Sequence, residues 1–177
     1  NQTLTLTYTT LNGCIATDSL NFESRALPVA TFTASSPVCL GNASTIAFTG
    51  TAGPSATFNW NFGSGTVLSG SGAGPYQVTW AATGTQLVTV QVTEAGCTSL
   101  IDSANVLVGG APTLTFTTVN PACPGTNTGS VTVNTSGGFA PLSYSWNTGS
   151  TTSTISAQPA GNYTVTVTNS NGCSATS

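Results

Sequence analysis

Few residues in this chain carry side chains that could do acid–base, nucleophilic or ligand chemistry. Among 177 residues there are four carboxylates, one basic residue, Arg25, and five cysteines. Two carboxylates placed across a sugar ring could form the catalytic pair of a glycoside hydrolase. Asp18 and Glu23 share one segment, however, and Glu94 and Asp102 share another, each flanked by strand-like sequence. We therefore predict solvated or turn-forming carboxylates and no catalytic residue.

The missing residue types exclude further classes of function. There is no histidine and no lysine, so the chain has no imidazole for a general base or metal ligand and no amine for a Schiff base. One basic residue cannot neutralise a row of phosphates, which excludes nucleic acid as a partner. We predict that the protein is not an enzyme and that it has no metal site and no cofactor.

The cysteines are far apart in sequence and lie beside turn-forming residues: Cys14, Cys39, Cys97, Cys123 and Cys173. They lack the C-x-x-C pairs of zinc and thioredoxin-like sites, and their spacing is typical of disulfide-forming proteins of an oxidising compartment. No apolar run approaches the eighteen or so residues of a membrane helix, and no signal peptide or initiator methionine is present. We predict an extracellular, mature fragment without a membrane span in this segment.

The elements that must position these residues are strands. Apolar residues alternate with threonine or other polar residues in several segments, among them residues 4–8, 88–92 and 163–167. Such alternation indicates strands with one buried face and one exposed face. Glycine and proline interrupt the alternation, and no segment keeps a helical period. We predict an all-β protein built of antiparallel sandwiches.

Two short motifs recur along the chain. SPVCLGN at residues 36–42 corresponds to NPACPGTN at residues 120–127. A Gly-Cys pair marks a later turn three times, as NGC, AGC and NGC at residues 12–14, 95–97 and 171–173. Repetition at this spacing is typical of tandem units.

The motifs divide the chain into three predicted parts. Residues 1–28 are the C-terminal part of a truncated unit, residues 29–109 are a complete unit, and residues 110–177 are a third unit that lacks its last strand. RALP and GGAP serve as the linkers, and they are too short to allow free rotation. We expect a stiff, elongated array.

Two resemblances follow from these units. FNWNFGSGT, followed by QLVTVQVTEAGC, resembles the polycystic-kidney-disease (PKD) type of immunoglobulin-like domain. Trp60, Phe62, Gly63 and Gly65 keep the structural part of its W-x-F-G-D-G pattern, whereas the usual acids are absent. Residues 121–176 resemble the repeat of large surface adhesins of gliding Bacteroidetes, in the order G-x-V, G-G-x-x-P-x-x-Y-x-W, A-G-x-Y-x-V-x-V and N-G-C. Both resemblances imply long, secreted, tandem-repeat surface proteins.

The tryptophans of the two units allow two interpretations. Trp60 and Trp146 could line a sugar-binding face. In immunoglobulin-like sandwiches, however, a tryptophan on the corresponding strand fills the core between the sheets. We predict core positions for both, and for Trp80 an inward position on an ordinary strand.

The resemblances imply a structural or adhesive repeat segment of a large secreted surface or filament protein. Ancillary domains of a secreted hydrolase and a carbohydrate-binding module are the alternatives. The predicted partners are neighbouring repeats or copies of the chain itself, with surface glycans as a further candidate. DSL at residues 18–20 and DSA at residues 102–104 resemble the acceptor motif of Bacteroidetes O-glycosylation, which implies glycans on Ser19 and Ser103.

The immunoglobulin-like resemblance also implies a disulfide scheme. The first and last strands of such a sandwich run the same way, so that cysteines at their beginnings lie at the same end. On this basis Cys39 pairs with Cys97 and Cys123 pairs with Cys173, each bond stabilising its unit by about 4 kcal/mol. Cys14 is left unpaired within the chain, with its partner upstream or in a neighbouring copy. Free thiols throughout remain the alternative.

Overall fold

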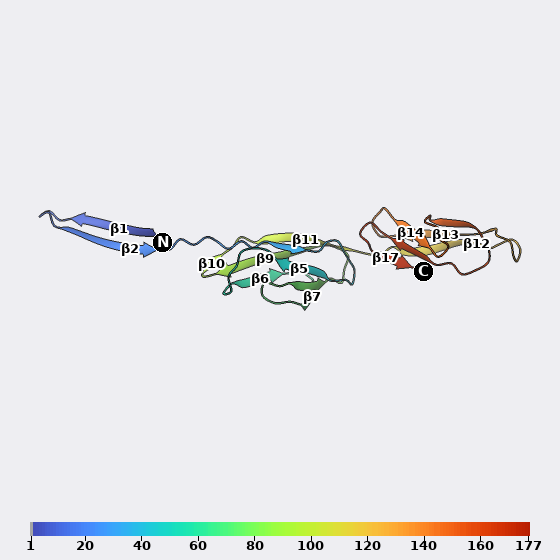
Figure 1. Cartoon of the computed structure of the whole chain (residues 1–177), viewed down its shortest axis with the longest axis horizontal. Coiled ribbons are helices and arrows are strands. Elements are labelled where there is room, and N and C mark those ends of the chain that lie inside the picture. Colours follow the sequence, from blue (N-terminus) through green and yellow to red (C-terminus); the bar gives the residue numbers. More distant parts are fainter. Residues whose placement is uncertain (1) are drawn as a thin grey trace.

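A computed structural model of the chain describes residues 2–177, so Asn1 of the predicted first unit lies outside the described residues. This range contains strands and no helix, and hence no helix that could cross a membrane. Three bodies lie in a row along the long axis (Figure 1): an N-terminal hairpin, a middle sandwich and a C-terminal sandwich. The predicted all-β class is confirmed.

The N-terminal hairpin is a ribbon of two antiparallel strands, β1 (Gln2–Thr9) and β2 (Ile15–Phe22). Leu4 faces Leu20 across the ribbon and Tyr8 faces Ala16, so most apolar residues of the two strands share one face. Asp18, opposite Leu6, lies on this face as well, and Ile15 lies on the other face. Leu4, Leu6 and Leu20 are each about two-thirds exposed. The ribbon therefore has an apolar face that no other described residue covers.

The middle sandwich packs two sheets against each other. One sheet has the order β3-β5-β8-β7, and in the other β9 lies between β6 on one side and β10 and β11 on the other, with β4 beyond β11. The strands of the first sheet are β3 (Phe32–Ala34), β5 (Ser44–Phe48), β7 (Thr66–Ser69) and β8 (Tyr76–Thr79). Those of the second are β4 (Val38–Cys39), β6 (Thr57–Asn61), β9 (Gly84–Glu94), β10 (Cys97–Thr98) and β11 (Asp102–Gly109).

Alternating valines of β9 and β11 form the centre of this core. Val88, Val90, Val92 and Val106 are completely buried, and the polar residues between them lie on the outer face. Gly65 is required beside them, because a β-carbon there would come within 2.8 Å of the Trp80 indole nitrogen and closer still to Val78. The period-two pattern in the sequence therefore becomes a one-sided buried surface, as a sandwich needs.

The C-terminal sandwich has two three-stranded sheets, ordered β12-β13-β15 and β14-β16-β17. Its core contains Val133, Trp146, Ile155, Val165 and Val167. A last strand, β17, is present here as three residues, although none was predicted within the chain. The strands are β12 (Thr113–Val119), β13 (Gly129–Ser136), β14 (Ser143–Trp146), β15 (Thr154–Gln158), β16 (Val165–Thr168) and β17 (Ser174–Thr176).

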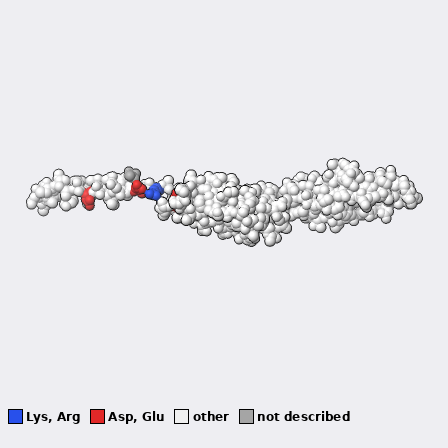
Figure 2. All heavy atoms as spheres, turned by 60° about the horizontal axis from the view of Figure 1, so that its bottom comes forward, with Lys and Arg blue, Asp and Glu red and all other residues white. Residues whose placement is uncertain are grey.

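Charge is confined to the first 102 residues of the chain. Asp102 is the last charged side chain in the sequence, so the C-terminal sandwich has none. The charged atoms visible in Figure 2 lie on the hairpin, on the first linker and at the adjoining end of the middle sandwich. The surface beyond them presents hydroxyl, amide and apolar groups.

Candidate functional site: a stapled joint between the sandwiches

The middle and C-terminal sandwiches meet at a joint whose first half is the end of β11. The short strand β4 runs parallel to β11, with Cys39 opposite Gly109, where the linker begins. The Leu40 amide donates to the Gly109 carbonyl (2.8 Å), and a turn follows in which the Asn42 amide donates to the Cys39 carbonyl (2.8 Å). Gly41 gives this turn the positive φ of +90° that it requires. The Cys39 sulfur is thereby fixed beside the linker.

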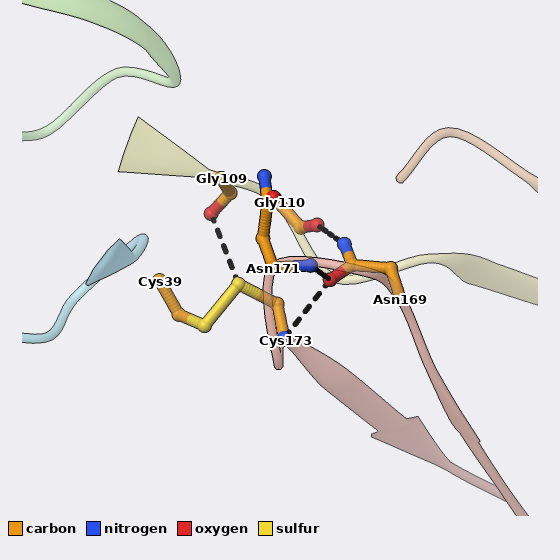
Figure 3. Close-up of a disulfide and its surroundings, with 6 residues drawn as sticks. All are labelled: Cys39, Gly109, Gly110, Asn169, Asn171 and Cys173. Atoms are coloured by element: carbon orange, nitrogen blue, oxygen red, sulfur yellow. Dashed lines mark hydrogen bonds between the residues drawn. A yellow bond between two sulfur atoms is a disulfide. The ribbon is translucent and has the colours of Figure 1, made fainter. Parts of the chain in front are cut away.

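The second half of the joint is the turn between β16 and β17. The Gly172 amide donates to the Asn169 carbonyl (3.0 Å), and the Asn169 amide donates to the Cys173 carbonyl (3.0 Å). Gly172, with φ of +79°, completes the turn immediately before Cys173. This turn lies beside Gly109 and Cys39 of the middle sandwich (Figure 3).

The Asn169 side chain ties the turn to the linker. Its Oδ1 accepts hydrogen bonds from the backbone amides of Asn171 and Cys173, both at 3.0 Å. Its Nδ2 donates to the carbonyl of Gly110 in the linker, at 2.9 Å (Figure 3). Because Asn169 is only 4% exposed, these bonds are shielded from competing water. One buried amide therefore holds the cysteine, its turn and the linker together.

A disulfide between Cys39 and Cys173 closes the joint (Figure 3). The two α-carbons are 5.5 Å apart, although 134 residues separate the cysteines in sequence. Cys173 Sγ also lies 3.7 Å from the Gly109 carbonyl oxygen, a contact and not a hydrogen bond, because a disulfide sulfur has no hydrogen to donate. The bond joins the two sandwiches to each other.

Close packing at the joint requires a small residue at Gly109. A β-carbon there would lie 3.3 Å from both Asn171 Nδ2 and Cys173 Sγ, tighter than ordinary contact. Asn171 Nδ2 is itself buried and has no hydrogen-bond partner among the described residues. The turn and the end of β11 thus pack closely enough that a side chain at position 109 would displace its neighbours slightly.

This pairing corrects the predicted disulfide scheme of Cys39 with Cys97 and Cys123 with Cys173. Cys97 pairs with Glu94 at one end of β9, whereas Cys39 lies at the end of β11 that is next to Gly84, the other end of β9. At about 3.3 Å per residue, the eleven-residue β9 separates them by about 30 Å. A disulfide needs α-carbons within about 7 Å.

The same geometry separates Cys123 from Cys173. Cys123 follows β12, whose last residue, Val119, pairs with Ser130 near the start of β13. The turn that carries Cys173 lies at the other end of β13, where the Ser170 amide donates to the Phe139 carbonyl (3.1 Å). The prediction was wrong because strand β3 precedes Cys39: the cysteine stands where the first strand of the unit finishes, and not where it begins.

Three cysteines are free among the described residues. Cys14 and Cys123 are exposed, and Cys97 is half-buried. Cys97 and Cys123 were predicted to form disulfides and do not, whereas Cys14 was predicted to be unpaired within the chain.

The other predicted site residues lie outside the joint. Trp146 is 4% exposed, in the core, and its indole donates to the Thr152 carbonyl (2.8 Å). Trp60 is half-buried against the middle core, stacked on Phe62 with 5.7 Å between ring centroids. Neither presents a free aromatic platform. Ser19 and Ser103 are exposed on strands β2 and β11.

Sequence reasoning missed Asn169, Gly109 and Gly110. The turn itself was marked by NGC, but the asparagine four residues before the cysteine reads as an ordinary turn residue. Its partner, Gly110, is 59 residues away in sequence. The available signal was the chain order of the first unit: Cys39 follows a whole strand and therefore lies at the end where the next unit begins.

Comparisons with known proteins agree with the two units. Residues 29–99 match the family model of the PKD domain, and residues 115–151 match that of the SprB repeat. The predicted PKD-like unit and gliding-type adhesin repeat are therefore confirmed. Domains of these two kinds are typically non-catalytic and are typical of extracellular or surface proteins.

Among solved structures, a C-terminal 282-residue fragment of intimin, determined with the intimin-binding domain of the translocated intimin receptor, is similar over 86% of this chain. The TM-score is 0.59, the identity is 17%, and this chain spans 63% of that fragment. The likeness supports a shared immunoglobulin-like fold. A Dscam chain matches over 94% of this chain and 50% of its own length, with 16% identity and a TM-score of 0.34. A comparison with curated proteins finds no match.

Proposed function

We propose that this chain, a PKD domain followed by an SprB repeat, is a non-enzymatic spacer segment of a large secreted surface or filament protein. Its task is to hold a binding region at a fixed distance from the cell. The observation that carries the proposal is the joint: two sandwiches stand end to end, and a disulfide and a buried asparagine fix them there. An end-to-end arrangement gives the greatest reach per residue that folded domains can offer.

The joint supports a spacer because it removes the bending that a short linker leaves. Inter-domain contacts within a chain are usually small, and relative motion of the domains is the default expectation. Here the linker carbonyls of Gly109 and Gly110 are engaged by Leu40 and Asn169, which belong to different sandwiches. The linker therefore has little freedom left in which to act as a hinge.

The hairpin fits the same function as the end of a further sandwich. When the hairpin sequence is aligned with the end of the C-terminal unit at Cys14 and Cys173, Leu6 of β1 is equivalent to Val165 of β16, and Tyr8 is equivalent to Val167. Val165 and Val167 are completely buried, whereas Leu6 and Tyr8 are more than half exposed. We infer that the apolar face of the hairpin packs against the remaining strands of an immunoglobulin-like unit.

Small-angle scattering from the oxidised full chain tests the spacer. We expect the distance distribution of a rod, with a cross-section of one sandwich and a length set by the bodies in a row. A compact globule, in which the sandwiches fold back on each other, would contradict the proposal. A matched measurement on the Cys39→Ala/Cys173→Ala chain should show a shorter mean end-to-end distance, because the joint then bends.

Ser19 and Ser103 are the proposed sites of O-glycosylation. Both lie on the outer, hydroxyl-rich face of their strands: Ser19 pairs with Thr5, and Ser103 pairs with Thr89. Glycans there would cover surface that carries almost no charge, and would hinder edge-to-edge association of strands. The intact mass of protein from its native source should exceed the polypeptide mass, and this excess should disappear in a Ser19→Ala/Ser103→Ala variant. A native mass equal to that of the polypeptide would exclude the modification.

A further inference from the structure

We propose that the Cys39–Cys173 joint is one copy of a repeating connection. Cys123 and Cys97 would each form one further disulfide of the same kind, with a cysteine of a neighbouring unit. In this connection, the cysteine after the first strand of one unit bonds to the post-turn cysteine of the unit that follows it. The disulfide partner of Cys123 thus lies in the following unit, and that of Cys97 lies in the preceding unit. The inference deepens the proposed spacer function, on which it rests, by naming what each end of the pair of sandwiches binds.

Cys123 precedes the same kind of turn as Cys39, although Cys39 lies in strand β4 and Cys123 lies outside any strand. Eleven positions separate Pro28 from Cys39, and the same number separates Pro112 from Cys123. The Cys123 carbonyl accepts a hydrogen bond from the amide three residues on, that of Thr126 (3.1 Å), as the Cys39 carbonyl does from Asn42. The glycine in the turn has a positive φ in both cases, +81° for Gly125. The turn that follows the cysteine is therefore the same in the two units.

Cys123 also lies at the corresponding end of its sandwich. Cys39 is at the end of the middle sandwich that faces the next unit, and its sulfur is covered by the turn of that unit. Cys123 follows β12 at the end of the C-terminal sandwich that is remote from the joint. It is exposed there. Cys123 is expected to be more exposed than Cys39 if the unit that would cover it is not part of this chain.

Cys97 corresponds to Cys173 in the other half of the joint. Each follows a glycine of nearly identical backbone geometry, Gly96 with φ of +80° and Gly172 with φ of +79°. Each also lines a hollow with residues of the linker that enters its own unit. For Cys173 the linker residue is Ala111, and for Cys97 the linker residues are 25–28. Cys97 thus stands beside the first linker as Cys173 stands beside the second.

The bond formed at each new joint is an ordinary disulfide, and its formation requires an oxidant. Two thiols, one from each unit, lose one hydrogen each as the sulfur–sulfur bond forms. Glutathione disulfide accepts the two electrons and two protons and leaves as two molecules of reduced glutathione. Cys97 and Cys123 lie at opposite ends of the pair of sandwiches, so neither can supply the partner of the other within one molecule.

A fusion of the full chain with its own residues 19–177 tests the inference. Cys14 and Cys173 occupy equivalent NGC turns, so Ser177 is equivalent to Asp18 in the aligned sequences. Residue 19, placed directly after Ser177, therefore continues strand β17 in register and leads into a second PKD domain. The fusion is oxidised with glutathione disulfide, alkylated with iodoacetamide and mapped by mass spectrometry without reduction. We expect Cys123 of the first copy to be linked to Cys97 of the second copy, with loss of alkylation at both.

The Cys39–Cys173 bond of each copy reports whether the fusion has folded. If those bonds form while Cys123 of the first copy and Cys97 of the second are both alkylated, or bonded elsewhere, the inference is overturned. As a matched control, Cys123→Ala in the first copy should restore alkylation at Cys97 of the second copy and nowhere else. Scattering separates this result from the spacer proposal: a compact fusion that carries the new bond contradicts the spacer alone.

Discussion

The two linkers of this chain, RALP and GGAP, are equally short and each ends in proline, but their surroundings differ. The proline stands before the first strand of a unit: Pro112 directly precedes β12, and Pro28 precedes β3, which begins at Phe32. Residues 109–112 are held by a disulfide and by the buried Asn169. Residues 23–27 are exposed and Pro28 is buried; an exposed ion pair is present, with Arg25 Nη2 3.3 Å from Glu23 Oε2, but no disulfide holds this linker among the described residues. The two linkers therefore differ in whether the following unit is bonded back to the preceding one, and we expect this difference, more than the length of the linker, to set the stiffness of a joint.

Removing the Cys39–Cys173 disulfide should remove most of the extra stabilisation that distinguishes the second linker from the first. Closing a loop of more than 100 residues stabilises a fold by about 5 kcal/mol on chain-entropy grounds. We expect Cys39→Ala/Cys173→Ala to lower the free energy of unfolding by about that amount, as measured by urea denaturation of the full chain. Cys97→Ala/Cys123→Ala is the matched control and should shift it by less than about 1 kcal/mol. Equal losses in the two double variants would show that the bond contributes nothing specific.

Asn169→Ala should weaken the non-covalent part of the joint. The substitution leaves the amides of Asn171 and Cys173 and the Gly110 carbonyl without their partner, at a cost of about 3 kcal/mol. Hydrogen exchange of the β16–β17 turn should rise accordingly. Asn171→Ala is the matched control in the same turn, because Asn171 Nδ2 has no partner to lose, and exchange there should change little. An equal rise in both variants would show that Asn169 has no special role.

Gly109→Ala should push the two sandwiches apart slightly. The added methyl group would lie 3.3 Å from Asn171 Nδ2 and from Cys173 Sγ, so the neighbours must shift by a few tenths of an ångström. We expect a cost of about 1 kcal/mol. In an Asn171→Ala background one of the two close contacts is gone and the cost should fall. A double-mutant cycle with no coupling would contradict this account of the packing.

Arg25→Ala should have the smallest effect. Both partners of its ion pair are more than half exposed, and exposed pairs contribute little. We expect no measurable change in the scattering curve or in the unfolding of the middle sandwich. A clear loss of extension in this variant would mean that the first linker is held by charge, and the contrast between the two linkers would then disappear.

Much of the fold could be predicted because its determinants are local. Alternation such as Val88, Val90 and Val92 fixes a strand and its buried face, and the recurring NGC turns fix the hairpins. The joint could not be predicted in the same way. Whether Cys39 faces Cys97 or Cys173 depends on which end of a sandwich each strand reaches, and that follows from topology. Asn169 acts on a carbonyl of another unit, so no nearby residue reveals its role.

The disulfide also decides how a pulling force would travel through the molecule. Tension applied between the two ends enters through residues 1–39, crosses the sulfur–sulfur bond and leaves through residues 173–177. Residues 40–172, which include the cores of both sandwiches, then lie on a side loop that bears no load while the bond lasts. Pulling can peel away the first strand of one unit and the last strand of the other, but it cannot unravel what lies between them. Under shear from flowing liquid, such a segment would reach its full extension early and then hold its length.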